Sequence, residues 1–426
     1  MSVNFCDTGL TPSMSALLLV WALATAPAQA QEVEPTPDTA APAASEGGKP
    51  LQWYVMPNVA FDTDDGLGFG GRFELNHGGD RFDPYRAAYV LQIYWTVRGY
   101  HHHRIRFDLV DLGPSRRFRL TAHLAFRAWM NDGYWGIGPG ALIEPGYDQV
   151  FDADDPRRKR YRYSLIQPFS HVVLRARLQG PWLAYGAADV KWSQVRTYEG
   201  SLLAEEQPYG MDGGWTTQLT LGLLRDTRVP EVSPREGTLV EASVRAAPPL
   251  PGGAGAFAGF FGAFRWYQAV GERGVVAVRL MADVLVGQVP FYEMVQWGGL
   301  EPVAGYGGSG TLRGLPFGRF RGPGKALMNV EARIDAFEHR LLKAPLLWQV
   351  VPYGDLGTVF MTGDENPRLA HLPVHPSAGL GLRPIWDEVF VGRIDLAVGA
   401  NPVDDGGPVA KLEPYVGFYL MFEHLY

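Results

Sequence analysis

The sequence predicts an all-β fold, an antiparallel transmembrane β-barrel of about 16 strands with one long loop inserted into the lumen. Short segments of alternating polarity recur along the chain, as in barrel strands. No apolar run after residue 30 approaches the ~18 residues that a membrane helix needs. Apolar residues make up 46% of the chain, yet the mean hydropathy is −0.09, as expected when apolar and polar residues alternate.

The N-terminal segment has the pattern of an export signal. Residues 16–26 form a short apolar core, and residues 28–30 read Ala-Gln-Ala, a signal-peptidase pattern. We therefore expect a signal peptide over 1–30, although Lys49 is the first basic residue and none precedes the apolar core. The alternative interpretation is a disordered N-terminal tail. Residues 31–50, rich in Pro and Ala, are expected to form a solvated tail.

The barrel is expected to occupy residues 51–426. In the segment 118–128, apolar side chains at even positions alternate with Arg, Thr and His at odd positions, and the segment 328–336 alternates in the same way. A soluble β-sandwich would also alternate, with its apolar face inside. Polar faces rich in Arg with Asp and Glu, and aromatic residues near strand ends, favour the membrane barrel.

Sixteen segments of this kind are predicted. Their centres lie near residues 55, 71, 90, 106, 123, 170, 187, 219, 242, 262, 280, 332, 354, 380, 394 and 420. The connections alternate in length, and the longer ones are 131–160, 196–212, 288–324, 361–374 and 400–413. Short periplasmic turns and long external loops are typical of outer-membrane barrels.

The chain closes on an apolar strand that resembles the C-terminal signal by which barrel proteins are recognised for insertion. Four residues of one face represent it, namely Phe418, Leu420, Phe422 and Tyr426. The strand can equally be the one that closes the barrel, and the two roles are compatible.

Several functional classes are disfavoured by the sequence. The net charge of −7 gives no reason to expect a nucleic-acid partner. Cys6 is the single cysteine and lies before the expected cleavage site, so a disulfide or cysteine metal cluster is not expected in the mature chain. No motif for catalysis, metal binding or a cofactor is found, and we expect a protein that is not an enzyme.

Three motifs follow one another in the second half of the chain. A turn motif contains Asp226, Arg228, Pro234 and Gly237. The long loop carries Leu312-Arg313-Gly314 and is followed by a strand with Glu331. The next strand contains Tyr353, Asp355 and Gly357 in a Y-x-D-x-G arrangement.

In this combination and order, the motifs resemble the BamA/TamA superfamily of outer-membrane assembly barrels, also called the bacterial surface antigen family. The resemblance implies that the loop folds back into the lumen with Arg313 and Gly314. Glu331 and Asp355 fall in the lumen-facing register, where an arginine fork can bind two carboxylates at once. Alternatively, Arg313 is an external charge, and the carboxylates pair with Arg333 or Arg393.

The resemblance implies a role in outer-membrane protein assembly or translocation. About 20 residues lie between the expected cleavage site and the barrel, which indicates a member without POTRA domains, working with a periplasmic partner chain. The alternative function is a passive pore or structural barrel. In either case we expect a monomeric barrel in the cell outer membrane, with outer-membrane lipids around it.

Overall fold

The computed structural model describes residues 51–78, 86–138, 143–144, 157–230, 233–341, 344–361, 374–386 and 390–421. The expected signal peptide and tail (1–50) lie outside these residues, as do Phe422 and Tyr426 of the C-terminal strand. Within the described residues, no helix has the length and apolar character needed to cross a membrane.

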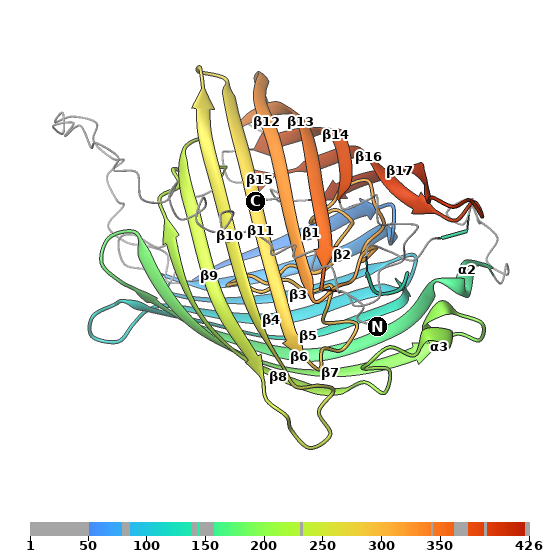
Figure 1. The fold of residues 1–426 in the computed structure, drawn as a ribbon. Helices are drawn as coiled ribbons and strands as arrows, with labels where there is room; N and C mark the ends of the chain where they lie inside the picture. Colours follow the sequence, from blue (N-terminus) through green and yellow to red (C-terminus); the bar gives the residue numbers. More distant parts are fainter. Residues whose placement is uncertain are drawn as a thin grey trace, which may run out of the picture. The chain divides into compact units, whose positions relative to one another are not determined.

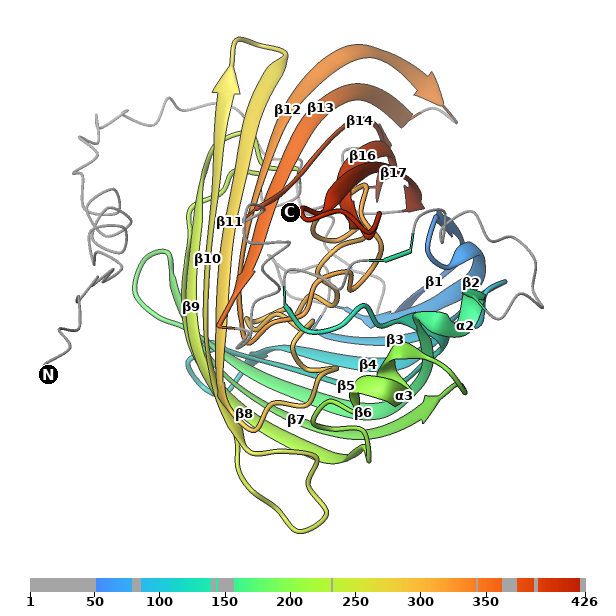
Figure 2. The ribbon, with the colours of Figure 1, turned by 45° about the vertical axis from the view of Figure 1, so that its right-hand side comes forward.

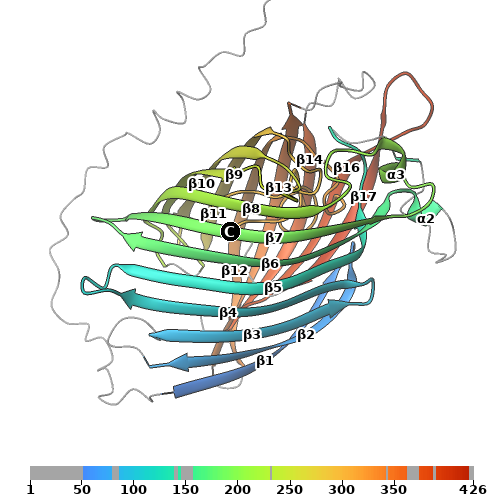
Figure 3. The same cartoon turned by 90° about the horizontal axis from the view of Figure 1, so that it is seen from below.

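The structure is a closed antiparallel barrel of sixteen strands, and the predicted fold is confirmed (Figures 1 and 3). The labelled elements β15 and β16 both pair with β14 and flank Gly392, so they are two parts of one strand. All sixteen predicted centres fall within strands. The strands are β1 (Leu51–Asp62), β2 (Gly66–His77), β3 (Ala87–Thr96), β4 (Tyr100–Leu112), β5 (Phe118–Gly133), β6 (Arg162–Arg177), β7 (Trp182–Thr197), β8 (Gly214–Asp226), β9 (Gly237–Ala247), β10 (Phe257–Val270), β11 (Gly274–Gly287), β12 (Gly324–Leu341), β13 (Ala344–Phe360), β14 (His375–Trp386), β15 (Phe390–Val391), β16 (Arg393–Val403) and β17 (Lys411–Met421).

The barrel is apolar outside and polar inside, the reverse of a soluble sandwich. Leu221, Phe260 and Leu124 expose 68%, 60% and 58% of their surface on the outer face. Thr121 on β5, one of the alternating polar positions, is buried on the lumen side. Because lipid is the outer solvent, the apolar side chains lie outside and the polar ones must find partners inside.

The longest connections lie at one end of the barrel. Within the described residues two short helices, α2 (Arg157–Arg160) and α3 (Leu202–Glu206), lie in the long connections after β5 and β7. The turns after β6 and β10 span only 178–181 and 271–273. Because successive strands run in opposite directions, the long connections share one end of the barrel with the turns 63–65 and 97–99, and the turns 178–181 and 271–273 lie at the other end.

The longest described connection, residues 288–323, folds back inside the barrel, and we call it the plug loop. Figure 2 shows it in orange, running through the space that the strands surround. Its buried apolar residues include Trp297, Leu312 and Phe320, which pack with Phe261 and Leu327 of the wall. The hydroxyl of Tyr306 lies 2.6 Å from the carbonyl oxygen of Ala326 and 2.9 Å from that of Thr358. The loop is thus part of the core.

The barrel closes through a short contact between β1 and β17. Among the described residues, two pairs join these strands, Phe61 with Leu420 and Asp62 with Tyr419. The Thr63 hydroxyl and the Phe418 backbone extend the contact by one residue. On its other edge, β1 pairs with β2 at twelve positions. We call this contact between the first and last described strands the seam.

Deleting residues 305–322 should raise the single-channel conductance of the protein in planar bilayers, because it removes the buried part of the plug loop. Shortening the exposed turn 405–408 between β16 and β17 is the matched control and should leave conductance unchanged. Equal conductance in the plug-loop variant and the control would show that the loop does not obstruct the lumen.

A candidate functional site where the plug loop meets the barrel wall

Three neighbouring parts of the wall present carboxylates to the plug loop. Glu331, Asp355 and Asp395 come from β12, β13 and β16, and all are buried on the lumen face. On β12, Arg333 lies two residues after Glu331. On β16, Arg393 lies two residues before Asp395, so each pair shares one face of its strand. The strand period of two therefore delivers several charges to one region of the lumen.

Arg313 from the plug loop is inserted among these carboxylates and is completely buried. Its Nε and Nη2 donate to the two oxygens of Asp355, each at 2.8 Å, in a bidentate contact. Its Nη1 donates to Glu331 at 2.8 Å and lies 3.5 Å from Asp395. The backbone N–H of Arg313 also donates to Asp355, at 3.1 Å. One guanidinium thus joins the loop to three strands.

One face of β13 supports the contact between Arg313 and the barrel wall. The Tyr353 ring lies under the guanidinium, with its centroid 3.3 Å from Cζ of Arg313. Asp355, two residues on, supplies the bidentate contact. Gly357, two further on, leaves space for the loop, since a Cβ there would lie 2.2 Å from the Tyr306 hydroxyl and 2.6 Å from a Leu312 methyl. The Y-x-D-x-G spacing thus provides a ring, an acceptor and a gap on the same strand face.

Gly314 brings the loop against the last strands of the barrel. Its φ is +77°, and a Cβ would lie 2.8 Å from the backbone nitrogen of Gly399 on β16. Only glycine fits such an approach without displacing backbone. The Gly314 N–H donates to the Tyr419 hydroxyl of β17 at 3.0 Å. The loop signature therefore contacts a strand of the closing seam.

The buried charges form a connected network. Arg333 donates to Glu331 at 2.9 Å, Arg383 donates to Asp395 at 2.6 Å, and Arg393 donates to Asp395 at 2.6 Å and to the carbonyl of Ser309 in the loop. Burial acts to lower the pKa of Arg313, but Asp355, Glu331 and Asp395 together raise that pKa well above its ordinary value. The guanidinium therefore stays charged, and its removal would leave carboxylates without a counter-charge.

The structure brings Arg313, Gly314, Glu331 and Asp355 together and adds two residues that sequence reasoning missed. Glu331 binds both Arg313 and Arg333, so the two partners considered as alternatives are present together. Asp395 and Tyr419 were not among the candidate residues. For Asp395 a signal was present, since it alternates with Arg393 on a strand with the lumen-facing pattern. The role of Tyr419 depends on where the loop ends up, which strand periodicity does not reveal.

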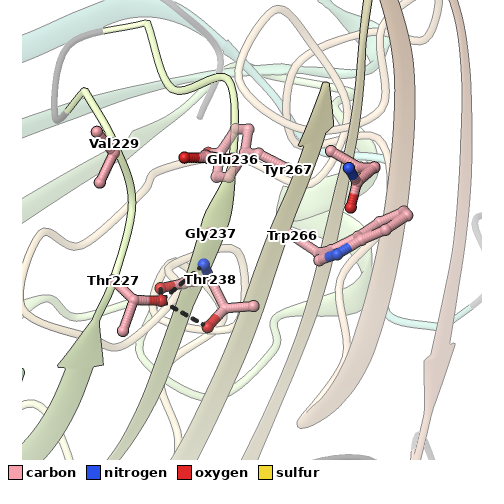
Figure 4. Close-up of a pocket in the computed structure, with 8 residues that line it drawn as sticks. Thr227, Val229, Glu236, Gly237, Thr238, Trp266 and Tyr267 are labelled. Carbon is pink, nitrogen blue, oxygen red and sulfur yellow. Dashed lines mark hydrogen bonds between the residues drawn. The ribbon is translucent and has the colours of Figure 1, made fainter. Parts of the chain in front are cut away.

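The turn motif lies between β8 and β9 and is braced internally (Figure 4). Arg228 makes a bidentate contact with Asp226, at 2.9 and 2.7 Å. Gly237 has a φ of +101°, and a Cβ would lie 2.1 Å from the Thr227 carbonyl oxygen. Thr227 and Thr238 hydrogen-bond across the turn, as the dashed lines show. Pro234 lies in this turn, beside two residues outside the described part of the chain.

Tyr267 lies between the turn motif and the buried network. It is the register partner of Gly237 in the β9–β10 ladder. Its ring centroid is 5.7 Å from the guanidinium of Arg333, which in turn binds Glu331. The two groups of predicted residues are therefore not in direct contact but share this tyrosine as a neighbour.

The C-terminal strand contributes Phe418 and Leu420 to the outer face. The ring of Phe418 lies 5.7 Å from that of Phe61 across the seam, and Leu420 pairs with Phe61. On the inner side, Asp64 in the β1–β2 turn accepts from the Phe317 N–H of the plug loop at 2.9 Å and from the Tyr415 hydroxyl at 3.3 Å. The seam and the plug loop therefore share contacts.

Comparison with known protein families identifies the family of this chain. Residues 147–407 match the Omp85 superfamily domain. The chain belongs to the Omp85 superfamily. A comparison with curated proteins gives no match. Membership makes this a protein of the bacterial outer membrane and confirms the expected likeness to BamA and TamA.

Solved structures share the fold of this Omp85 barrel. BamA from Haemophilus ducreyi lacking POTRA domains 1–3 is 14% identical with a TM-score of 0.57, and the match covers 87% of this chain and 70% of that one. CdiB from Escherichia coli is 11% identical with a TM-score of 0.57, covering 87% and 63%. CdiB from Acinetobacter baumannii is 12% identical with a TM-score of 0.51, covering 88% and 60%. This chain thus spans about two thirds of these structures.

Arg313→Ala should lower the unfolding temperature of the Omp85 barrel and expose the plug loop to protease. Asp355 would keep Asn329 as a hydrogen-bond partner but lose its counter-charge, and breaking a buried pair costs about 3–5 kcal/mol. Arg313→Lys should rescue only in part, because an ammonium group cannot make the two-pronged contact. Asp355→Asn should be milder, since Glu331 and Asp395 still hold the arginine.

A double-mutant cycle between Arg313 and Asp355 measures the contact itself. Arg235→Ala, which removes a partly exposed ion pair with Asp335, is the matched control and should leave the loop protected. Additive effects of the Arg313 and Asp355 variants would contradict a direct interaction.

Proposed function

We propose that this barrel inserts or translocates polypeptides at the outer membrane, together with a periplasmic partner chain. In this proposal the plug loop is a lock that keeps the barrel closed, and the β1–β17 seam is the part that opens. The observation that carries the proposal is that a single loop, held by buried charges, also contacts both sides of the seam, through Tyr419 of β17 and Asp64 beside β1.

The lock is supported by the way the loop binds the last part of the wall. Arg313 reaches β12, β13 and β16, and Gly314 reaches β17. Arg319 donates to Asn401 at 2.7 Å and to the carbonyl of Pro402 at 3.0 Å, which adds a second contact to β16. As long as the loop is in place, these strands are held in one arrangement.

Opening at the seam is supported by its place in the chain. In the described barrel β1 pairs with β17 although no turn links the two strands, whereas β1 and β2 are joined by the turn 63–65. Once apart, the strands would present unpaired backbone groups, a template for a strand of another chain. A client strand can therefore be accommodated by β-augmentation at this edge.

A partner at the periplasmic end is supported by the rigidity of that rim. Arg235 in the β8–β9 turn pairs with Asp335 of β12 at 2.9 Å and donates to the carbonyl of Glu272 in the β10–β11 turn at 2.8 Å. One side chain thus fixes three neighbouring elements relative to one another. A rigid rim loses little conformational entropy on binding, which favours docking of a second protein.

A passive pore remains the alternative function. It is favoured by one observation, a lumenal cavity of about 1110 Å³ beside the plug loop. A pore would conduct without client specificity and would not require the seam to open. The seam experiment below separates the two functions.

A disulfide across the seam, made by Phe61→Cys with Leu420→Cys, should abolish function by holding β1 against β17. The two positions are register partners, so the bond requires little backbone movement. Function is measured in a strain lacking the gene, by complementation and by the abundance of folded outer-membrane and secreted proteins. We expect the oxidised variant to fail and the reduced variant to complement.

The matched control is Val55→Cys with Phe73→Cys, register partners in the β1–β2 ladder, which should complement in both redox states. Loss of the gene without any change in outer-membrane or secreted proteins would contradict the proposal. Full complementation by the oxidised seam variant would favour the passive pore.

A further inference from the structure

The lumen contains a cavity of about 1110 Å³ that the proposed function does not use. On one side it is lined by residues 296–303 of the plug loop. Elsewhere it reaches Arg228 and Pro234 of the β8–β9 turn and Met421 near the end of β17. It therefore extends from the plug loop toward the periplasmic turns, and its volume is slightly above the roughly 300–1,000 Å³ of typical small-molecule sites.

The lining of this cavity is strongly cationic, although the whole chain has a net charge of −7. Within the described residues, ten Lys and Arg side chains line it against three carboxylates. The cations are Arg72, Arg104, Arg106, Arg127, Arg175, Lys191, Arg228, Arg245, Arg265 and Arg279, and the carboxylates are Asp189, Glu293 and Glu301.

Some of these cations are neutralised within the wall. Lys191 pairs with Glu293 at 2.7 Å, Arg245 with Asp283 at 2.9 Å, and Arg228 with Asp226 at 2.7 Å. Arg72 pairs with Glu74 at 2.7 Å. Asp189, one of the three lining carboxylates, has its Oδ1 atom 2.5 Å from Nδ1 of His171. Four of the ten cations thus have a carboxylate partner at 2.9 Å or less.

Four further arginines line the cavity on β4, β5 and β6, and we call Arg104, Arg106, Arg127 and Arg175 the arginine wall. Arg104 and Arg127 bond to neutral side-chain oxygens, of Gln92 at 2.8 Å and Gln167 at 3.3 Å. In the described part of the chain, no ion pair includes Arg175.

Arg106 has a carboxylate partner, but a shared and distant one. It lies 3.7 Å from Asp108, whose oxygens already accept from Arg119 at 3.0 and 2.5 Å and from Thr121 at 2.9 Å. Arg119 and Arg175 are direct cross-strand partners on β5 and β6, an arrangement in which like charges repel. One carboxylate therefore serves a region crowded with guanidinium groups.

We infer that this cavity binds a polyvalent oxyanion, a soluble molecule carrying several phosphate or carboxylate groups, against the arginine wall. Guanidinium groups bind both oxyanions through paired N–H donors. Several such groups around a recess focus the potential and concentrate anions there. A bound oxyanion adds negative charge beside Arg106 and Arg175, so binding relieves the repulsion between the paired guanidinium groups of Arg119 and Arg175. The ligand enters from the periplasmic turns toward which the cavity extends.

This inference is independent of the proposed assembly function and is tested by binding alone. Isothermal titration calorimetry on the full chain, folded in a non-ionic detergent, uses inorganic tripolyphosphate as the probe. We expect saturable binding that weakens as NaCl is raised, because salt screens the attraction. Citrate is the carboxylate probe and spermidine the cationic one. Binding of tripolyphosphate without citrate would restrict the class to phosphates, and spermidine should not bind.

The test variant is Arg106→Gln with Arg175→Gln, which should weaken tripolyphosphate binding at least about tenfold. The matched control is Arg177→Gln, on the same strand as Arg175 but mostly exposed, paired with Asp111 and outside the cavity lining. It should bind like the wild type. Heat-modifiable migration in gels checks that both variants are folded.

Two results would overturn the inference. The first is failure of the wild-type protein to bind tripolyphosphate, or equal binding of spermidine, and neither requires a variant to fold. The second is unchanged tripolyphosphate affinity in the folded double variant, since the anion would then be held elsewhere.

Discussion

A buried guanidinium must have its charge neutralised, and the arrangement of the lumen depends on this requirement at Arg313. The side chain has no exposed surface, and three carboxylates from three strands surround it. This requirement fixes the position of the plug loop, because Arg313 can be neutralised only when the loop lies beside the three carboxylates. Gly357 and Gly314 have no side chain, and each therefore leaves room for the plug loop to approach the barrel wall. Tyr419 of β17 is drawn into the same contact through the Gly314 N–H.

The two walls of the lumen use charge differently. Around Arg313 the guanidinium and carboxylate groups lie within hydrogen-bonding distance of one another, and the region is sealed by apolar packing of the loop. Across the lumen, the arginine wall borders a cavity and carries more positive charge than nearby carboxylates can offset. The first arrangement stabilises a fixed loop position, because each partner is already supplied. The second borders open space, where we infer that a mobile anion binds.

Strand periodicity was enough to predict the barrel, because lipid outside and charge inside impose the same alternation on every strand. The segment 118–128 illustrates this, with Leu124 facing outward and Thr121 inward as the polarity indicates. Periodicity also placed Glu331 and Asp355 on the lumen face, and the family signature drew attention to Arg313. It could not show that Asp395 and Tyr419 meet the same loop, because that depends on which distant strands become neighbours when the sheet closes. Periodicity also could not show that Arg245 has an ion-pair partner whereas Arg175 has none among the described ion pairs. The partner of Arg245, Asp283, lies on another strand. The predicted roles of the signal peptide and of Phe422 and Tyr426 fall outside the described residues.

The contact between Gly314 and Tyr419 joins residues 105 positions apart in the chain. Contacts of such long sequence separation must overcome a loop-closure cost before they stabilise the fold. The tyrosine belongs to the last described strand, so the site that receives the loop is incomplete until that strand has joined the sheet. The loop's final position is therefore reached only at the end of biogenesis, and closing the cylinder and filling it become a single cooperative step. A nascent barrel of this kind would remain hollow and open-edged until its C-terminal strand arrives.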